Sequence, residues 1–137
     1  MANSRVQQHL PNATATDVWA VVGNFGDMSW HPFITECTLA EDGKSRTLKM
    51  VNGATLVQNL IGQDDAAMQY RYGISEPGRL PVRGFVGTVT VQNLNGAMYT
   101  SEADFDAPKG VDVAAAKGAI DGILDAGLAE LAKRFGG

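Results

Sequence analysis

Two polar side chains are the strongest candidates for chemistry, because the alternation of their strands points both toward the interior. Arg46 alternates with leucine and methionine in residues 45–51, and Gln58 alternates with alanine and leucine in residues 54–63. A guanidinium without partners is costly to bury, so Arg46 must meet water in a cavity, a hydrogen-bonding neighbour, or an anionic or carbonyl-bearing ligand. The alternatives are that the alternation is misread, or that Arg46 lies at a strand end and extends into solvent.

Aromatic side chains share this inward direction on the later strands. The inward sets contain Tyr70, Tyr72, Phe85 and Tyr99, and Arg83 has the same parity as Phe85. Inward polar residues beside tyrosines are more typical of a pocket lining than of a dry core. Tyrosines supply flat contact area with a polar tip, while the arginine and the glutamine donate hydrogen bonds to oxygen. We therefore expect a small hydrophobic or aromatic ligand that carries one oxygen function.

A short aromatic segment, residues 28–33, has no helical or strand periodicity. It contains Trp30, His31 and Phe33. Aromatic residues in a loop commonly anchor that loop to the core, and the alternative is that they form one wall of a pocket. We expect the pocket wall to include all three.

The same residues suggest a catalytic set. His31 is a candidate general base, Tyr72 a candidate acid, and Arg46 with Gln58 would stabilise a developing oxyanion. Such groups suit a cyclisation, dehydration or isomerisation through an enol, with no metal or organic cofactor. Against catalysis, the alternation places no acidic residue in the pocket, and a lone histidine in an aromatic loop is commonly a packed residue. Two functions stay open: a cofactor-independent enzyme and a non-catalytic small-molecule or lipid carrier.

The C-terminal segment, residues 111–135, is the only one periodic over the length of a full helix. Its apolar stripe consists of Val113, Ala116, Ile120, Leu124, Leu128, Leu131 and Phe135. Gly118, Gly122 and Gly127 lie inside it, and each should cost about 1 kcal/mol relative to alanine. Gly118 and Gly122 are one turn apart and form a strip of small residues with neighbouring alanines. We expect this strip, with Gly122, to contact the ligand as a lid; the alternative is tight packing on a sheet.

Composition excludes several classes of partner. The chain has 137 residues and a formal net charge of -4, without a run of lysine or arginine. Nucleic acid and anionic membrane surfaces are therefore not expected partners. Cys37 is the only cysteine, and with His9 and His31 as the only histidines we expect no metal site. No signal peptide or long apolar run is present, so we expect a cytoplasmic protein that is a monomer or a weak homodimer.

Turn signals divide the chain into strands within a single domain, residues 1–137. We expect strands at residues 4–10, 34–40, 45–51, 54–63, 67–75, 82–92 and 97–106, with short helical turns after the first strand. Hairpin connections make the sheet antiparallel. The predicted class is α+β, a curved sheet wrapped around the terminal helix. Loops 28–33 and 76–81 are the expected moving parts for ligand entry.

The order of several short motifs resembles a known family. They are Asp17-Val18-Trp19, Val21-Val22-Gly23-Asn24-Phe25, Trp30-His31-Pro32, Arg46-Thr47-Leu48, Gly53 through Leu60, Asp64-Asp65, Tyr70-Arg71-Tyr72 and Pro81 through Val89. Together they resemble the polyketide cyclase/dehydrase-type branch of the START-like (SRPBCC) superfamily over nearly the whole chain. Within that branch the sequence is most similar to bacterial relatives of plant lachrymatory factor synthase.

This resemblance implies a helix-grip fold: a seven-stranded curved antiparallel sheet, two short helices, and a long C-terminal helix over a central cavity. Members serve as lipid or hormone binders, cyclases, isomerases and condensing enzymes, so fold does not settle function. In the synthase-like proteins an arginine and a glutamate facing the cavity carry the proton transfers. Arg46 matches the first position. The second is Gln58, whose amide cannot transfer a proton, and Phe85 matches a position often held by an aromatic hydroxyl.

Overall fold

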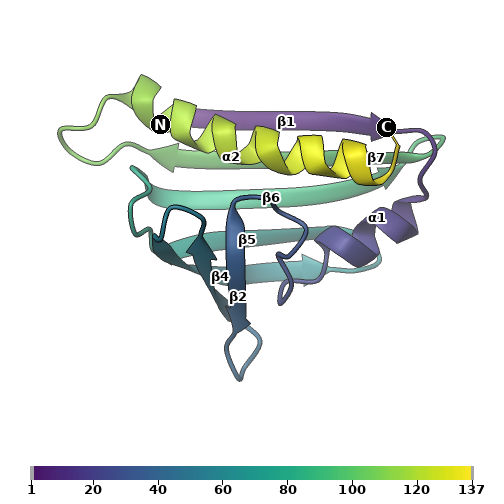
Figure 1. Cartoon of the computed structure of the whole chain (residues 1–137), viewed down its shortest axis with the longest axis horizontal. Coiled ribbons are helices and arrows are strands. Elements are labelled where there is room, and N and C mark those ends of the chain that lie inside the picture. The colour runs from purple at the N-terminus through teal and green to yellow at the C-terminus, as the bar shows by residue number, and fades with distance from the viewer. Residues whose placement is uncertain (1, 137) are drawn as a thin grey trace.

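The computed structural model describes residues 2–136, which form a sheet with one long and one short helix (Figure 1). The elements, in chain order, are β1 (Ala2–Leu10), α1 (Ala15–Val22), β2 (Ile34–Leu39), β3 (Ser45–Met50), β4 (Thr55–Asp64), β5 (Gln69–Glu76), β6 (Arg83–Asn93), β7 (Ala97–Asp106) and α2 (Val113–Arg134). All seven expected strands are present in this part of the chain, with ends displaced by a few residues at most.

The strands form one antiparallel sheet in the order β1-β7-β6-β5-β4-β3-β2. Neighbours along the chain pair as hairpins from β2 to β7, and β1 closes the other edge by pairing with β7. Helix α2 packs against β1 and β7 and runs along them in Figure 1. This arrangement confirms the predicted helix-grip α+β fold.

Helix α2 forms where the periodicity of its apolar residues predicts it. The side chain of Asp112 caps its first turn by accepting a hydrogen bond from the backbone N–H of Ala114 at 3.4 Å. The buried face contains Ala116, Ile120, Leu124, Gly127 and Leu131. The first residue of the predicted stripe, Val113, is instead 50% exposed, so the buried face begins one turn later.

The segment after β1 contains one short helix among the described residues, where two short helices were expected. Helix α1 begins after Thr14, whose side chain accepts from the backbone N–H of Asp17 at 3.1 Å. The next residues form turns, in which Asn24 accepts from the N–H of Gly26 at 3.2 Å and Asp27 from that of Ser29 at 2.8 Å. Such local side-chain bonds compete with helical ones, so the prediction of a second short helix was wrong.

The inward alternation agrees with the observed burial on nearly every strand. Arg83 is the exception, because it is exposed while Phe85 on the same parity is buried. The β6–β7 register shifts between Arg83 and Val86, where Gly84 has a φ of 60°. A bulge of this kind reverses the direction of the preceding side chain.

Within the described residues, no helix is both long and apolar enough to cross a membrane.

Candidate ligand-binding site

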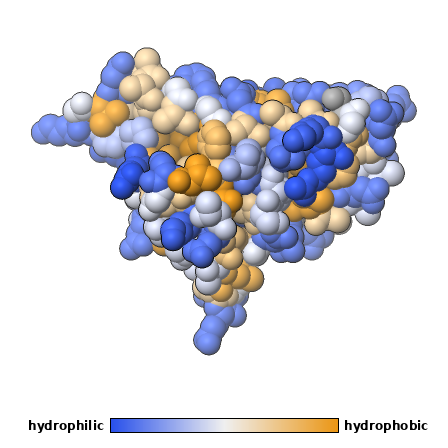
Figure 2. All heavy atoms as spheres, in the orientation of Figure 1, coloured by the Kyte–Doolittle hydropathy of each residue, from blue (hydrophilic) through white to orange (hydrophobic). Residues whose placement is uncertain are grey.

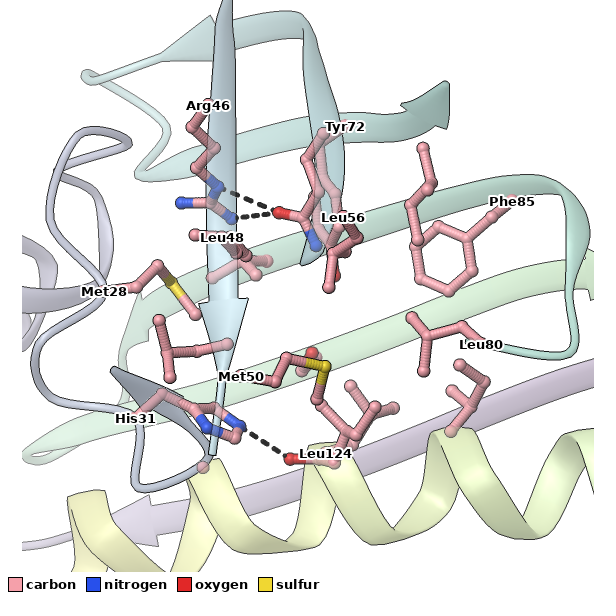
Figure 3. A pocket seen from close by; sticks show the side chains of 18 of the residues that line it. Met28, His31, Arg46, Leu48, Met50, Leu56, Tyr72, Leu80, Phe85 and Leu124 are labelled. Carbon is pink, nitrogen blue, oxygen red and sulfur yellow. Dashed lines mark hydrogen bonds between the residues drawn. The ribbon is translucent and has the colours of Figure 1, made fainter. Parts of the chain in front are cut away.

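A cavity lies between helix α2 and the inner face of the sheet (Figure 3). The space open to the centres of water molecules is about 70 Å³, which is room for a handful of waters or one small ring-sized ligand. Eight residues singled out from the sequence line it: Trp30, His31, Arg46, Gln58, Tyr70, Tyr72, Phe85 and Tyr99. The structure therefore brings these residues together, while their roles stay predictions.

One edge of the Arg46 guanidinium donates two hydrogen bonds to a single atom of Gln58. Its Nε and Nη2 both donate to Oε1 of Gln58, at 2.9 and 2.7 Å, the two dashed lines that leave Arg46 in Figure 3. Its Nη1 donates to the backbone oxygen of Phe25 at 3.0 Å. Arg46 is only 2% exposed, so it does not extend from a strand end into solvent.

The charge of Arg46 is surrounded by rings and neutral oxygens and, among the described residues, has no carboxylate beside it. Its guanidinium carbon lies 4.1 Å from the centre of the Phe25 ring and 5.7 Å from that of Tyr72, in range for cation–π attraction. No aspartate or glutamate is among the described residues that line the cavity. The cavity therefore holds a buried positive charge without a negative partner.

Tyr72 lies over a bare stretch of backbone in the neighbouring strand. It pairs directly with Gly87 of β6, where a Cβ would come within 2.3 Å of the tyrosine ring. The Phe85 ring packs against that of Tyr72, with ring centres 5.6 Å apart. Burial, followed by the neighbouring Tyr70, raises the pKa of Tyr72 well above its usual value. Its hydroxyl therefore stays protonated and can act as a hydrogen-bond donor.

Tyr99 on β7 is buried in the same wall. Burial is also the main cause that raises the pKa of Tyr99, and a hydrogen bond with Ser101 acts in the opposite direction. Tyr72 and Tyr99 thus stay protonated and neutral across the physiological pH range, and they add no negative charge near Arg46.

His31 joins the aromatic loop to helix α2. Its Nδ1 accepts from the backbone N–H of Phe33 at 3.1 Å, so the proton is on Nε2, which donates to the backbone oxygen of Ile123 at 2.9 Å. Burial, and to a lesser extent the charge of Arg46, lowers the pKa of His31, while the bond to Ile123 raises it. Both nitrogens are occupied by backbone groups, an arrangement that favours a positioning role, and the assignment of His31 as a general base stays a prediction.

Two residues expected in the cavity do not line it. Phe33 packs against the His31 ring, with centres 5.5 Å apart, and is absent from the cavity wall. Gly122 is exposed, and a Cβ placed there or at Gly118 would meet nothing within 4 Å. The predicted lid of small residues therefore faces solvent, because Gly122 lies two positions from Ile120 and so on the opposite side of the helix.

The glycine that allows close approach is Gly127. A Cβ there would lie 3.1 Å from Cδ2 of His31 and 3.3 Å from Cζ3 of Trp30. Gly127 is on the buried face, and the sequence offered a signal for it: it lies three residues after Leu124 and four before Leu131, in the apolar stripe. Besides Trp30, His31 and Gly127, four lining residues belong neither to the inward sets of the strands nor to the apolar stripe of the helix: Met28, Ile34, Leu80 and Ile123.

Nothing in the described part of the chain groups three or more histidine, cysteine, aspartate or glutamate side chains for a metal. The cavity offers donors and apolar walls. A sheet that grips a long C-terminal helix over such a cavity defines the helix-grip architecture. Residues 1–136 match the family described as polyketide cyclase/dehydrase and lipid transport, and the chain belongs to that family.

Solved structures share this fold over nearly the whole chain. The protein XoxI from Bacillus cereus is 25% identical with a TM-score of 0.92, over 98% of this chain and 96% of that one. A START superfamily protein from Mycobacterium smegmatis is 15% identical with a TM-score of 0.75, over 98% of this chain and 95% of that one. The di-domain aromatase/cyclase BexL of the BE-7585A biosynthetic pathway is 18% identical with a TM-score of 0.81, over 96% of this chain and 45% of that one. No curated protein matches the sequence.

Proposed function

We propose that the protein binds a small hydrophobic or aromatic molecule in the cavity beneath α2, with an oxygen of that molecule directed toward Arg46 and Gln58. The observation that carries this proposal is the buried guanidinium of Arg46, which is 2% exposed and bonded only to neutral oxygens. The family description, which includes cyclases and lipid transport, supports a hydrophobic ligand.

The apolar wall of the cavity reaches the molecular surface. Ile34 and Leu80 line the cavity but are only half-buried, and Figure 2 shows hydrophobic atoms at the surface in the region between α2 and β2. Leu80 belongs to the loop between β5 and β6. We propose that ligands enter by movement of this loop, since opening of loop 28–33 must break the bond from His31 to Ile123.

A second candidate is catalysis of the cyclase/dehydratase or isomerase type without a cofactor. Arg46, Gln58 and Tyr72 are donors around one end of the cavity and would stabilise an enolate oxygen as it forms. Proton transfer by Gln58 or by His31 is not part of this proposal, because an amide cannot carry it and both imidazole nitrogens are occupied. The closer resemblance to lachrymatory factor synthase also stays a prediction. This chain has Gln58 at the position where the synthase-like proteins have the glutamate that transfers protons.

Binding and turnover assays on a panel of small aromatic and hydrophobic carbonyl compounds test both candidates. Wild type and Arg46→Ala are compared with Arg71→Ala, which removes an exposed arginine from β5, and with His31→Ala. A carrier shows saturable binding without product, and an enzyme shows product that Arg46→Ala removes. Equal binding by wild type and Arg46→Ala would overturn the proposed site.

The cytoplasmic location and the monomeric or weakly dimeric state also stay proposals from the sequence. Light scattering during size-exclusion chromatography over a range of concentrations tests the second.

A further inference from the structure

The orientation of the Gln58 amide is fixed by its partner. The arginine side chain has five N–H groups that donate hydrogen bonds, and it has no acceptor atom. The two bonds from Arg46 therefore require the oxygen of Gln58 to face the guanidinium, at 2.9 and 2.7 Å. The amide nitrogen of Gln58 must point away from Arg46, and it has no hydrogen-bond partner among residues 2–136. It is a donor at the cavity wall that lacks an acceptor.

Further donors in the same wall are also without acceptors. The indole N–H of Trp30 is buried and has no partner within the described chain. The Tyr72 hydroxyl has none among residues 2–136 either. On Arg46, Nη1 and Nη2 each make one hydrogen bond, which leaves one N–H on each without a protein acceptor. The polar groups of the cavity are thus chiefly donors.

The charge at this end of the cavity is positive and uncompensated. Arg46 donates its hydrogen bonds to the amide oxygen of Gln58 and the backbone oxygen of Phe25, and the described lining residues include no carboxylate. His31 is held neutral by burial, which lowers its pKa, and Tyr72 and Tyr99 are held neutral by burial, which raises theirs. A neutral ligand would leave this charge unpaired, whereas an anion would pair with it away from bulk water.

We infer that the ligand binds as an anion, with a carboxylate, enolate or phenolate group at the Arg46–Gln58 end and a small apolar body among the aromatic residues. This inference rests on the proposed function and narrows its ligand class. Because the pair would form inside the cavity, its affinity should depend only weakly on salt, unlike binding to a surface charge. A neutral carbonyl compound of the same shape should bind less tightly.

The matched pair phenylacetate and phenylacetamide tests the inference, since the two differ little in size and shape. Titration of the full chain at pH 7, followed by NMR of backbone amides, gives both affinities. We expect phenylacetate to bind about ten-fold more tightly, as charge-assisted hydrogen bonds exceed neutral ones by about that factor. Raising the salt concentration should leave this ratio nearly unchanged.

The variant Gln58→Glu supplies the decisive comparison. It places a carboxylate beside Arg46 at the same distance and so compensates the charge from within the protein. We expect it to lose the preference for phenylacetate, while Arg71→Met, on the outer face, keeps it. Arg46→Met provides a second variant without the charge if Gln58→Glu does not fold.

The outcomes separate the two proposals. Equal affinity of wild type for the acid and the amide, or a preference that survives in both Gln58→Glu and Arg46→Met, overturns the anion inference while the cavity remains a binding site. No binding of either probe, or chemical-shift changes confined to the outer face, overturns the proposed site and the inference with it.

Discussion

The imidazole of His31 lies directly against Gly127 of α2, where a Cβ would be 3.1 Å from its Cδ2 atom. The same ring donates to the backbone oxygen of Ile123, one turn earlier on the helix. A loop near the start of the chain is thereby joined to the last helix through a ring and a bare segment of backbone. This contact holds Trp30 in the cavity wall, and it requires a residue without a side chain at position 127.

The three glycines inside α2 should respond to alanine in opposite ways. Gly118 and Gly122 face open space. Replacing either with alanine should therefore stabilise the protein by about 1 kcal/mol through helix propensity. Gly127→Ala must displace His31, which is buried and bonded at both nitrogens. We expect a net loss, since overpacking costs about 1–3 kcal/mol. Urea unfolding of the three variants measures this, and a gain for Gly127→Ala equal to that for Gly122→Ala would contradict it.

Removal of either partner of the Arg46–Gln58 pair should have unequal effects on stability. Gln58→Ala leaves a buried guanidinium with fewer acceptors, and hydrogen bonds to charged groups contribute about 1.5–3 kcal/mol. Arg46→Leu removes both the hydrogen bonds and the buried charge. Its loss of stability should therefore be smaller than that of Gln58→Ala. Chemical unfolding of both variants tests the order. If Arg46→Leu is the more destabilised, the buried charge is better compensated than the neutral contacts indicate.

Arg46→Leu should also weaken ligand binding by several-fold or more, while its fold is retained. The loss follows from removal of a charge-assisted hydrogen bond to the ligand oxygen. Phenylacetate titrations of wild type, Arg46→Leu and the outer-face variant Arg71→Leu measure it. An unchanged affinity in Arg46→Leu would assign that residue a purely structural role.

Stability should fall as the solution is acidified through the histidine range. Burial lowers the pKa of native His31 below its ordinary value of 6.5, so at mildly acidic pH the unfolded chain binds a proton that the native chain does not. The free energy of unfolding therefore decreases as pH falls below about 6.5. Arg46, the nearby charged group, contributes in the same direction. Urea unfolding of wild type and His31→Gln between pH 7.5 and 5.5 checks this, and equal pH slopes would exclude His31 as the cause.

Trp30 should report ligand binding, and Trp19 should not. Trp30 lines the cavity and is 5% exposed, whereas the indole of Trp19 donates to Asp65 at 3.2 Å and lies outside the cavity wall. We expect phenylacetate to change the fluorescence of Trp19→Phe, which keeps Trp30, and to leave that of Trp30→Phe nearly unchanged. A response found only in Trp30→Phe would place the ligand or the gate near α1.

The alternation of strands predicted the polar end of the cavity because side chains in a sheet repeat every two residues, and hydrogen-bonded register preserves that repeat. Arg46 and Gln58 were placed inward on this basis and are direct cross-strand partners in β3 and β4. Arg83 was misplaced because a bulge interrupts the repeat, and no residue pattern near Gly84 required one.

The loops and the helix face were harder to predict. Met28 and Leu80 reach the cavity from segments without periodicity, so only tertiary contacts determine their direction. Gly122 was chosen for its spacing from Gly118, although the apolar stripe through Ile120 and Leu124 already placed it on the outer side. The occupation of both His31 nitrogens depends on backbone groups, which no side-chain pattern reveals.

The pairing of β1 with β7 has a consequence for how this protein is made. Ala2 pairs with Phe105 and Leu10 with Ala97, so β1 is synthesised long before β7, the strand with which it pairs. Contacts between such distant segments form slowly, because a long loop must close before they contribute. Until then β1 exposes unpaired backbone that other nascent chains can bind. Helix α2 follows β7, so the cavity takes shape only after both have been synthesised, and chaperone binding to β1 would protect the chain in the interval.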